Sequence, residues 1–258
     1  MSSEYLLKLL RNGKREDGRG LNEFRKISFK TGIIKKAEGS AVVNFGNTSV
    51  IAGVKLDVGE PFSDSPNEGI LIVNAEFSPI AAPFFEPGPP DENAIELARI
   101  VDRGIRGSNL IDFEKLCIKE GEKVWIVYID IHTINNDGNL IDVSFLASIL
   151  ALKTTLMPKY EGKIIREEKV DKLPLRNYFP INISTYKAEN ILFIDPSLKE
   201  SNLAEACLSI CIRDDDKINS VQKIGSGSFS FEEIEKIFNL TKTKAREIRN
   251  LLSSSYIS

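Results

Sequence analysis

Five charged side chains recur at spacings of four, three, four and three within the segment FFEPGPPDENAIELARIVDRGIRGSNL, residues 84–110. They are Glu92, Glu96, Arg99, Arg103 and Arg106. On an α-helix these spacings place all five on one narrow stripe. A guanidinium group is planar, always charged and well suited to phosphate. The three arginines are therefore candidate phosphate-binding residues.

The same stripe also has a purely structural interpretation. Its acids stand at the N-terminal end and its bases at the C-terminal end, as the helix dipole prefers. Glu96 with Arg99, and Asp102 with Arg106, have the spacing of ion pairs. Arg99 and Arg103, however, are like charges at i, i+4, which repel unless an anion lies between them. The pattern leaves both interpretations open.

Few other residues have a type and spacing suited to catalysis. The single histidine, His132, fits an ordinary strand position, and the GxSxG segment of serine hydrolases is absent. Cys117, Cys207 and Cys211 form no CxxC pair, so we expect neither a structural zinc site nor a disulfide framework. GSGSF at 225–229 lacks the lysine of a phosphate loop, and the acids 214–216 fit a solvated turn.

Charge is plentiful but balanced, with 34 Lys+Arg against 37 Asp+Glu in 258 residues. A free-standing nucleic-acid binder would usually be more basic, so contact with an anionic polymer requires a local patch or a shared surface. Residues 56–96 hold acids and no Lys or Arg. That segment is either a solvated acidic face or a docking surface for a basic partner.

Neither a signal peptide nor a membrane-spanning run is expected. The cysteine usage favours a reducing compartment, so we expect a cytoplasmic protein.

The elements that position these residues follow from hydrophobic periodicity. Strands are expected at 24–30, 40–57 (a hairpin), 70–77 and 123–134, and helices at about 3–11, 91–106 and 142–156. On the second helix Ala94, Leu97, Ala98, Val101 and Ile105 should face the core. Asp142 is the expected N-cap of the third helix and Pro158 its stop.

The second part of the chain repeats the order of strands followed by a helix. Strands are expected at 181–188, 191–194, 206–213 and 218–225, and Ser230 with Glu233 predicts a capping box before a helix that reaches about residue 252. The charged, proline-containing residues 158–177 favour a linker or crossover. We therefore expect an α+β protein with two similarly built lobes, at 1–177 and 178–258.

Four segments resemble the exosome subunits of the RNase PH family. They are residues 84–108, REDGRGLNEFRKI near the start, KVWIVYIDIHTINNDGNLIDVSFLASILAL in the middle and VQKIGSGSFSFEEIEKI near the end. Their order and spacing fit the family over most of the chain. The non-catalytic archaeal ring subunit is the most similar member.

The resemblance implies two RNase PH-like lobes and a hexameric ring of three heterodimers, each with a catalytic paralogue. Such a ring degrades single-stranded RNA from its 3′ end by phosphorolysis, adds 3′ tails in reverse and carries RNA-binding cap subunits. Phosphate and Mg²⁺ would act at the partner's active site, and this chain would bind neither. It also implies that Arg99, Arg103 and Arg106 contact the RNA backbone, with Arg106 alternatively paired to Asp102.

The resemblance also suggests why this chain would be inactive. Active relatives hold phosphate on a segment like Gly-Gly-Thr-Arg-Thr at a helix N-terminus, and residues 143–147 are the expected match, with Leu146 in place of the arginine. Active relatives also carry an Asp-x-Asp, for which Glu205 and Cys207 are the expected matches, and a cysteine is a poor ligand for Mg²⁺. Glu205, Arg15 and Arg19 remain open, each as a functional residue or an ordinary surface one.

Two alternatives remain at this stage. The chain could itself be an active phosphate-dependent 3′-to-5′ exoribonuclease, or it could be an RNA-binding scaffold of another assembly.

Overall fold

The computed structural model describes residues 3–255. Its helices are α1 (Ser3–Arg11), α2 (Glu92–Ser108), α3 (Leu140–Lys153), α4 (Leu198–Ser201) and α5 (Phe231–Ser255), with a 3-10 turn η1 (Glu114–Leu116). The strands are β1 (Ile27–Thr31), β2 (Gly39–Phe45), β3 (Thr48–Gly59), β4 (Ile70–Phe77), β5 (Cys117–Lys119), β6 (Lys123–Asn135), β7 (Leu156–Tyr160), β8 (Ile164–Lys172), β9 (Ile181–Ala188), β10 (Ile191–Ile194), β11 (Ala206–Ile212) and β12 (Ile218–Gly225). The expected α+β class is confirmed.

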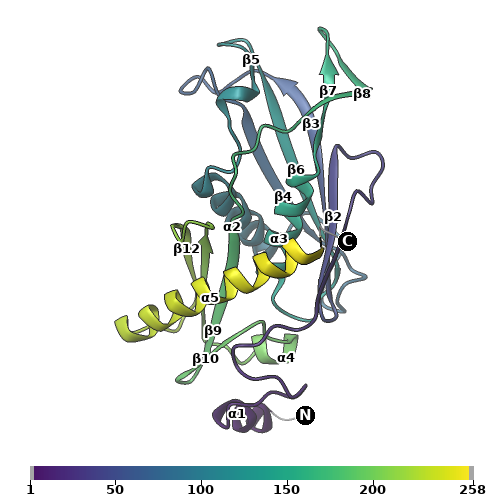
Figure 1. Ribbon diagram of the computed structural model, residues 1–258. Helices are drawn as coiled ribbons and strands as arrows, with labels where there is room; N and C mark the ends of the chain where they lie inside the picture. Colours follow the sequence, from purple (N-terminus) through teal and green to yellow (C-terminus); the bar gives the residue numbers. More distant parts are fainter. Residues whose placement is uncertain (1–2, 256–258) are drawn as a thin grey trace.

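Two larger sheets carry the fold. The first has the order β1-β2-β3-β6-β4, with β5 paired to β6, and only its β4–β6 pair is parallel. The second has the order β10-β9-β11-β12 and is antiparallel throughout. In Figure 1 the second sheet lies toward the lower end with α1 and α4, while α2 and α3 lie in the middle of the molecule.

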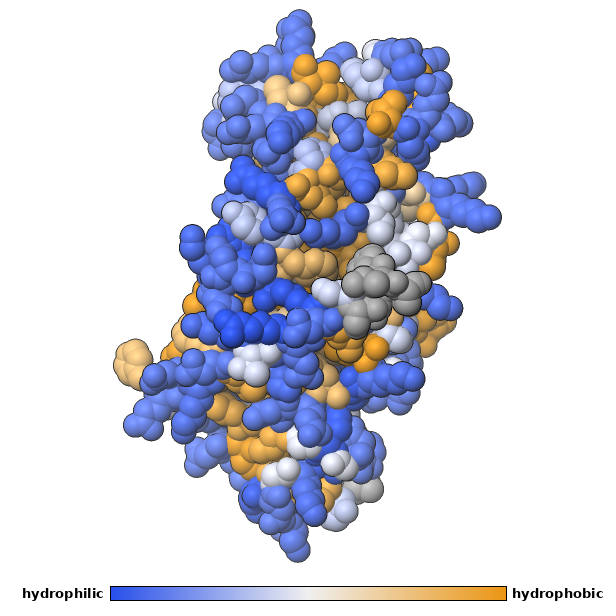
Figure 2. All heavy atoms as spheres, viewed as in Figure 1, coloured by the Kyte–Doolittle hydropathy of each residue, from blue (hydrophilic) through white to orange (hydrophobic). Residues whose placement is uncertain are grey.

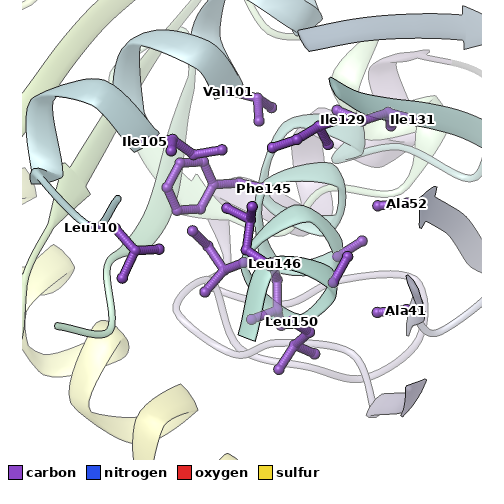
Figure 3. Packing of buried hydrophobic residues seen from close by; sticks show 14 of the residues in the cluster. Ala41, Ala52, Val101, Ile105, Leu110, Ile129, Ile131, Phe145, Leu146 and Leu150 are labelled. Atoms are coloured by element: carbon purple, nitrogen blue, oxygen red, sulfur yellow. The ribbon is translucent and has the colours of Figure 1, made fainter. Parts of the chain in front are cut away.

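The helix α3 forms the centre of the core. Every residue from Asp142 to Leu152 is buried, so this helix is enclosed on all sides rather than amphipathic. It packs on β2 and β3 of the first sheet and on β9 of the second. Figure 3 shows Phe145, Leu146 and Leu150 among buried residues of both helices and strands. One continuous core therefore joins the two parts of the chain.

The helix α2 packs against α3, β4 and β12. Gly104 permits the close contact with α3, because a Cβ at that position would lie 2.5 Å from Cε2 of Phe145. The five residues expected on its inner face, Ala94, Leu97, Ala98, Val101 and Ile105, are all buried as predicted. The charged stripe is consequently held on the outer side.

Two expectations about local structure are wrong, besides the expected stop of α3 at Pro158, which lies in β7 beyond the end of that helix at Lys153. Residues 158–177 are not a plain linker, because β7 and β8 pair there as an antiparallel hairpin. Its register shifts at Pro158, which accommodates a residue without an N–H, and Lys159 pairs with Glu161 and Glu168 on its surface. Charged composition hid these strands because they are mostly exposed. The division at 177/178 stays a prediction.

The second error concerns Asp142, which is not an N-cap. The N-cap of α3 is Asn139, in a left-handed conformation with φ 54°. By contrast, the capping box of Ser230 and Glu233 at α5 is confirmed, with both reciprocal hydrogen bonds present.

The molecular surface is largely polar on the face shown in Figure 2, where hydrophobic residues lie in small groups among hydrophilic ones. Within residues 3–255, no helix combines the length and the apolar character that crossing a bilayer requires.

Candidate nucleic-acid interface

The arginine stripe stands on a well-capped helix. The Asp91 side chain accepts a hydrogen bond from the Ala94 amide at 2.8 Å, and Asn109 ends the helix in a left-handed conformation with φ 51°. With both ends fixed and one face buried, α2 is a rigid support for the exposed Arg99, Arg103 and Arg106.

The three arginines have different surroundings. Among the described residues, Arg99 has neither an ion pair nor a hydrogen bond from its side chain, so the pair with Glu96 does not form. Arg103 donates to Oε1 of Gln222 on β12 at 2.7 Å. Arg106 pairs with Asp102 at 2.9 Å, donates to the Leu71 carbonyl and lies over the Phe113 ring. Of the two roles left open for Arg106, the structure shows the ion pair.

Arg99 and Arg103 border a surface groove of about 460 Å³ between α2 and β12. Gln222 forms its far wall, and Glu92 and Glu96 lie at its other end. Arg99 can therefore rotate toward an anion in the groove without breaking an internal contact. The groove has a basic half suited to phosphate and an acidic half that opposes it.

A second, smaller cavity of about 290 Å³ adjoins the groove and shares Glu96 and Ile100 with it. The N-terminal end of α3 contributes Leu140 and Ile141 to its wall. First-turn N–H groups and the helix dipole would favour an anion here, but these two side chains are aliphatic and none of the described residues lining the cavity is Lys, Arg or His.

The expected phosphate segment, residues 143–147, lies elsewhere. It occupies the second and third turns of α3, and Leu146 is buried in the core with only 2% of its surface exposed (Figure 3). The expectation that this segment lies at a helix N-terminus is wrong. The helix begins at Leu140, after Asn139 in a left-handed conformation, and not at Asp142 as the sequence suggested. The residues at the first turn are Leu140, Ile141 and Asp142.

Asp142 stands at the centre of a buried polar cluster. Its carboxylate accepts hydrogen bonds from Asn182 and from the amide and hydroxyl of Ser184, at 2.7–3.1 Å. Burial raises the pKa of Asp142 to about 6, although these hydrogen bonds favour the ionised form. At neutral pH Asp142 is therefore mostly negative, which opposes phosphate at the start of α3.

The two residues expected at the metal-binding positions do not form a site. Cys207 is buried on β11, and burial together with nearby Asp142 raises the pKa of its thiol. Glu205 is exposed just before that strand and accepts a hydrogen bond from the Glu189 amide at 3.2 Å. Within residues 3–255, no group of three or more His, Cys, Asp or Glu side chains is placed to hold a metal ion.

The remaining candidates have structural partners. Arg15 is buried and pairs with Glu200, and Arg19 pairs with Asp17 and Asp195, so the interpretation of both as a solvated loop is wrong. Sequence spacing gave no sign of these partners, which lie as far as 185 residues away. His132 lies on β6, half-exposed, with Nδ1 3.4 Å from Glu76.

The acids 214–216 do form a turn, as expected. Asp215 pairs with Arg213 and Asp216 with Arg246, while Asp214 accepts a hydrogen bond from the Phe179 amide.

Comparisons with known proteins agree over nearly the whole chain. Residues 23–158 match the model of the 3′ exoribonuclease family, domain 1, and residues 178–244 match domain 2 of that family. The exosome complex component Rrp42 of Methanopyrus kandleri is 46% identical over 253 residues, covering 96% of this chain and 94% of the relative. The component of the same name from Methanosarcina acetivorans is 47% identical over 252 residues, covering 97% and 93%.

Solved structures give the same result. A chain of the Archaeoglobus fulgidus exosome with RNA bound to the active site superimposes with a TM-score of 0.90 at 43% identity, covering 96% of each chain. Rice Rrp46 shares the fold, with a TM-score of 0.71 at 16% identity, covering 93% of this chain and 99% of the rice chain.

Proposed function

The chain belongs to the 3′ exoribonuclease family, RNase PH type, and from this membership we propose that it is an RNA-guiding ring subunit of an archaeal exosome without a phosphorolytic site of its own. Its similarity to relatives named as exosome components extends over almost their entire length. One of the structurally similar proteins is a chain of an exosome with RNA bound to the active site.

In this proposal three copies alternate with three copies of a catalytic paralogue in a ring, and RNA-binding cap subunits sit on the ring. The paralogue removes nucleotides from the 3′ end of single-stranded RNA by phosphate attack, and the reverse reaction adds tails. Phosphate and Mg²⁺ act at the paralogue's site. This chain contributes Arg99 and Arg103 beside the entering strand. These contacts read no bases, which suits a nuclease that accepts any sequence.

The observation that carries the RNA role is the guanidinium of Arg99, which has no partner within residues 3–255 and lies beside Arg103 in an open groove. Two like charges four residues apart repel each other across a helix turn. A phosphate between them would remove that cost and form charge-assisted hydrogen bonds. Arg106, already paired with Asp102, contributes less.

The absence of phosphorolytic activity is supported by the start of α3 and by β11. Phosphorolysis needs an anion site for the attacking phosphate and acids that hold a metal ion near the leaving oxygen. Aliphatic Leu140 and Ile141 with anionic Asp142 do not fit phosphate, and buried Cys207 does not fit Mg²⁺. No catalytic step is therefore assigned to this chain.

The test compares the chain alone with the chain co-expressed with a catalytic paralogue. The chain alone should release no nucleoside diphosphate from single-stranded RNA in phosphate and Mg²⁺, whereas the co-purified complex should release it. Release by the chain alone would instead support an active exoribonuclease. Failure to co-purify with the paralogue would support a scaffold of another assembly.

A further inference from the structure

The cavity of about 290 Å³ at the start of α3 has no role in the proposal above. It opens beside the arginine groove, because Glu96 and Ile100 line both. Its wall comes from regions far apart in the sequence: the end of β4 with the following loop, α2, the loop before α3 with the start of α3, β9, α4 and β12. A strand held by its phosphates in the groove would have this cavity next to its bases.

The wall of the cavity contains a cluster of aromatic rings. Phe77 and Phe85 are stacked with ring centroids 4.6 Å apart, and Phe84 meets Phe85 edge-on at 5.0 Å. All three line the cavity, together with aliphatic residues that include Ile141 and Ile224. Aromatic side chains bind single-stranded nucleic acid by stacking on the faces of its bases.

The charges of the cavity exclude phosphate but admit a neutral ring. Glu96 is the charged side chain among the described lining residues, and it is an acid. Polar contacts are available from the amides of Asn93 and Asn202, which both donate and accept hydrogen bonds. A flat, uncharged group with polar edges fits this wall, and a nucleobase has those properties.

Asn139 provides a second observation. It lines the cavity, is 2% exposed, and its amide nitrogen donates to Oδ1 of Asp195 at 2.9 Å. A carboxylate only accepts hydrogen bonds, so Asp195 fixes the orientation of this amide. Its Oδ1 then has no partner among the described residues. A buried acceptor without a partner is costly, and an N–H at the edge of a base would satisfy it.

We infer that this cavity receives one base of a single-stranded RNA whose phosphates lie on Arg99 and Arg103, an inference that rests on the proposed RNA role of those arginines. The start of α3, where active relatives hold phosphate, would here hold a base. Because asparagine amides pair with any base, the cavity would bind RNA without selecting a sequence.

The test measures binding of the full chain to a single-stranded oligoribonucleotide and to a fully abasic oligomer of the same length, over a range of salt concentrations. The natural oligomer should bind roughly five- to a hundred-fold more tightly, the range for one stacked base. Phe85→Leu keeps the volume apolar but removes the aromatic face, and it should abolish most of that difference. The salt dependence, which reports phosphate contacts, should not change.

Two matched controls and a second variant complete the design. Phe62→Leu changes an exposed phenylalanine outside the cavity and should have no effect. Asn202→Met narrows the cavity from an exposed rim position without altering a buried residue, and it should act like Phe85→Leu, whereas Asn177→Met should not.

The outcomes separate this inference from the function on which it rests. Absent binding, or binding that neither salt nor Arg99→Ala weakens, would overturn the RNA role itself. Salt-dependent binding that is equal for natural and abasic oligomers would overturn the base site alone. So would a preference for the natural oligomer that survives both Phe85→Leu and Asn202→Met.

Discussion

Arg99, Arg103 and Arg106 lie on one face of α2, but their guanidinium groups differ in how many contacts they already make within the protein. The sequence predicted the stripe correctly because a helical period and a buried opposite face are local properties. It could not assign the partner of Arg103, because Gln222 is 119 residues away. Spacing indicated the pair of Arg106 with Asp102, which is present, and equally the pair of Glu96 with Arg99, which does not form among the described residues.

That distinction predicts unequal effects of equal charge changes. Arg99→Ala and Arg103→Ala should each weaken RNA binding to a similar extent for all sequences and reduce the salt dependence of log K by about one phosphate contact. Changing both to Glu should also slow degradation by the assembled ring while leaving assembly intact. Binding titrations at several salt concentrations, with gel filtration of the complex, measure both effects.

Arg106→Ala is the matched control, because it removes the same charge from the same helix face. Its loss of affinity should be smaller, since its guanidinium is already held by Asp102 and the Leu71 carbonyl. Equal losses for all three variants would indicate a general charge effect and contradict a specific groove.

At the scale of elements, α3 shows both the strength and the limit of sequence reasoning. The sequence predicted a helix here, which is confirmed, and the structure adds that it is buried from Asp142 to Leu152. Its first residue was misplaced, because Asn139 adopts a left-handed conformation at the N-cap, and Asp142, which suits a cap by type, instead binds β9 from within the first turn. The β7–β8 hairpin was missed for a related reason, since exposed strands lack hydrophobic alternation.

The contact between α3 and β9 predicts a pH dependence of stability. The pKa of Asp142 is about 6 in the folded protein against 3.8 without burial. The folded state therefore binds the proton more tightly, and ionisation of Asp142 lowers the free energy of unfolding as pH rises from about 4 to 6. Two pKa units correspond to roughly 3 kcal/mol.

Asp142→Asn removes this titration. The free energy of unfolding of the variant, relative to that of the unmodified chain, should increase as the pH rises from 4 to 7. The altered hydrogen bonds to Ser184 add a destabilisation that does not depend on pH. Urea unfolding of both proteins across this range measures the difference. A difference that stays constant with pH would show that Asp142 does not titrate there.

At the scale of the whole molecule, the N-terminal segment is tied to the second sheet region by buried arginines. Arg15 donates to Glu200 and to the carbonyls of Ile194 and Asp195, while Arg25 binds the Asp195 carboxylate. In Figure 1 this segment passes beside α4 and β10 before entering the first sheet. No local pattern links residues so far apart, which is why the sequence left Arg15 open as a functional or an ordinary surface residue and did not indicate a buried ion pair.

Arg15 and Glu200 therefore form a buried ion pair between distant parts of the chain, and its loss should lower the free energy of unfolding. Burial alone would raise the pKa of Glu200, and Arg15 is the main reason that it is lowered instead. Arg15→Met would leave a buried carboxylate without its partner, which costs about 3–5 kcal/mol in other proteins. The loss should be measurable by urea unfolding at neutral pH and should shrink at acidic pH, where Glu200 binds a proton.

The double variant Arg15→Met, Glu200→Gln tests whether the unpaired charge causes that loss. Because it removes the carboxylate as well, it should recover part of the stability, and its remaining deficit should depend less on pH. Arg11→Met is the exposed control, since Arg11 pairs with Glu189 at the surface and should contribute little. If Arg11→Met destabilised the chain as much as Arg15→Met, burial would not be the reason for the cost. If the double variant were no more stable than Arg15→Met, the lost bonds to Ile194 and Asp195 would be responsible instead.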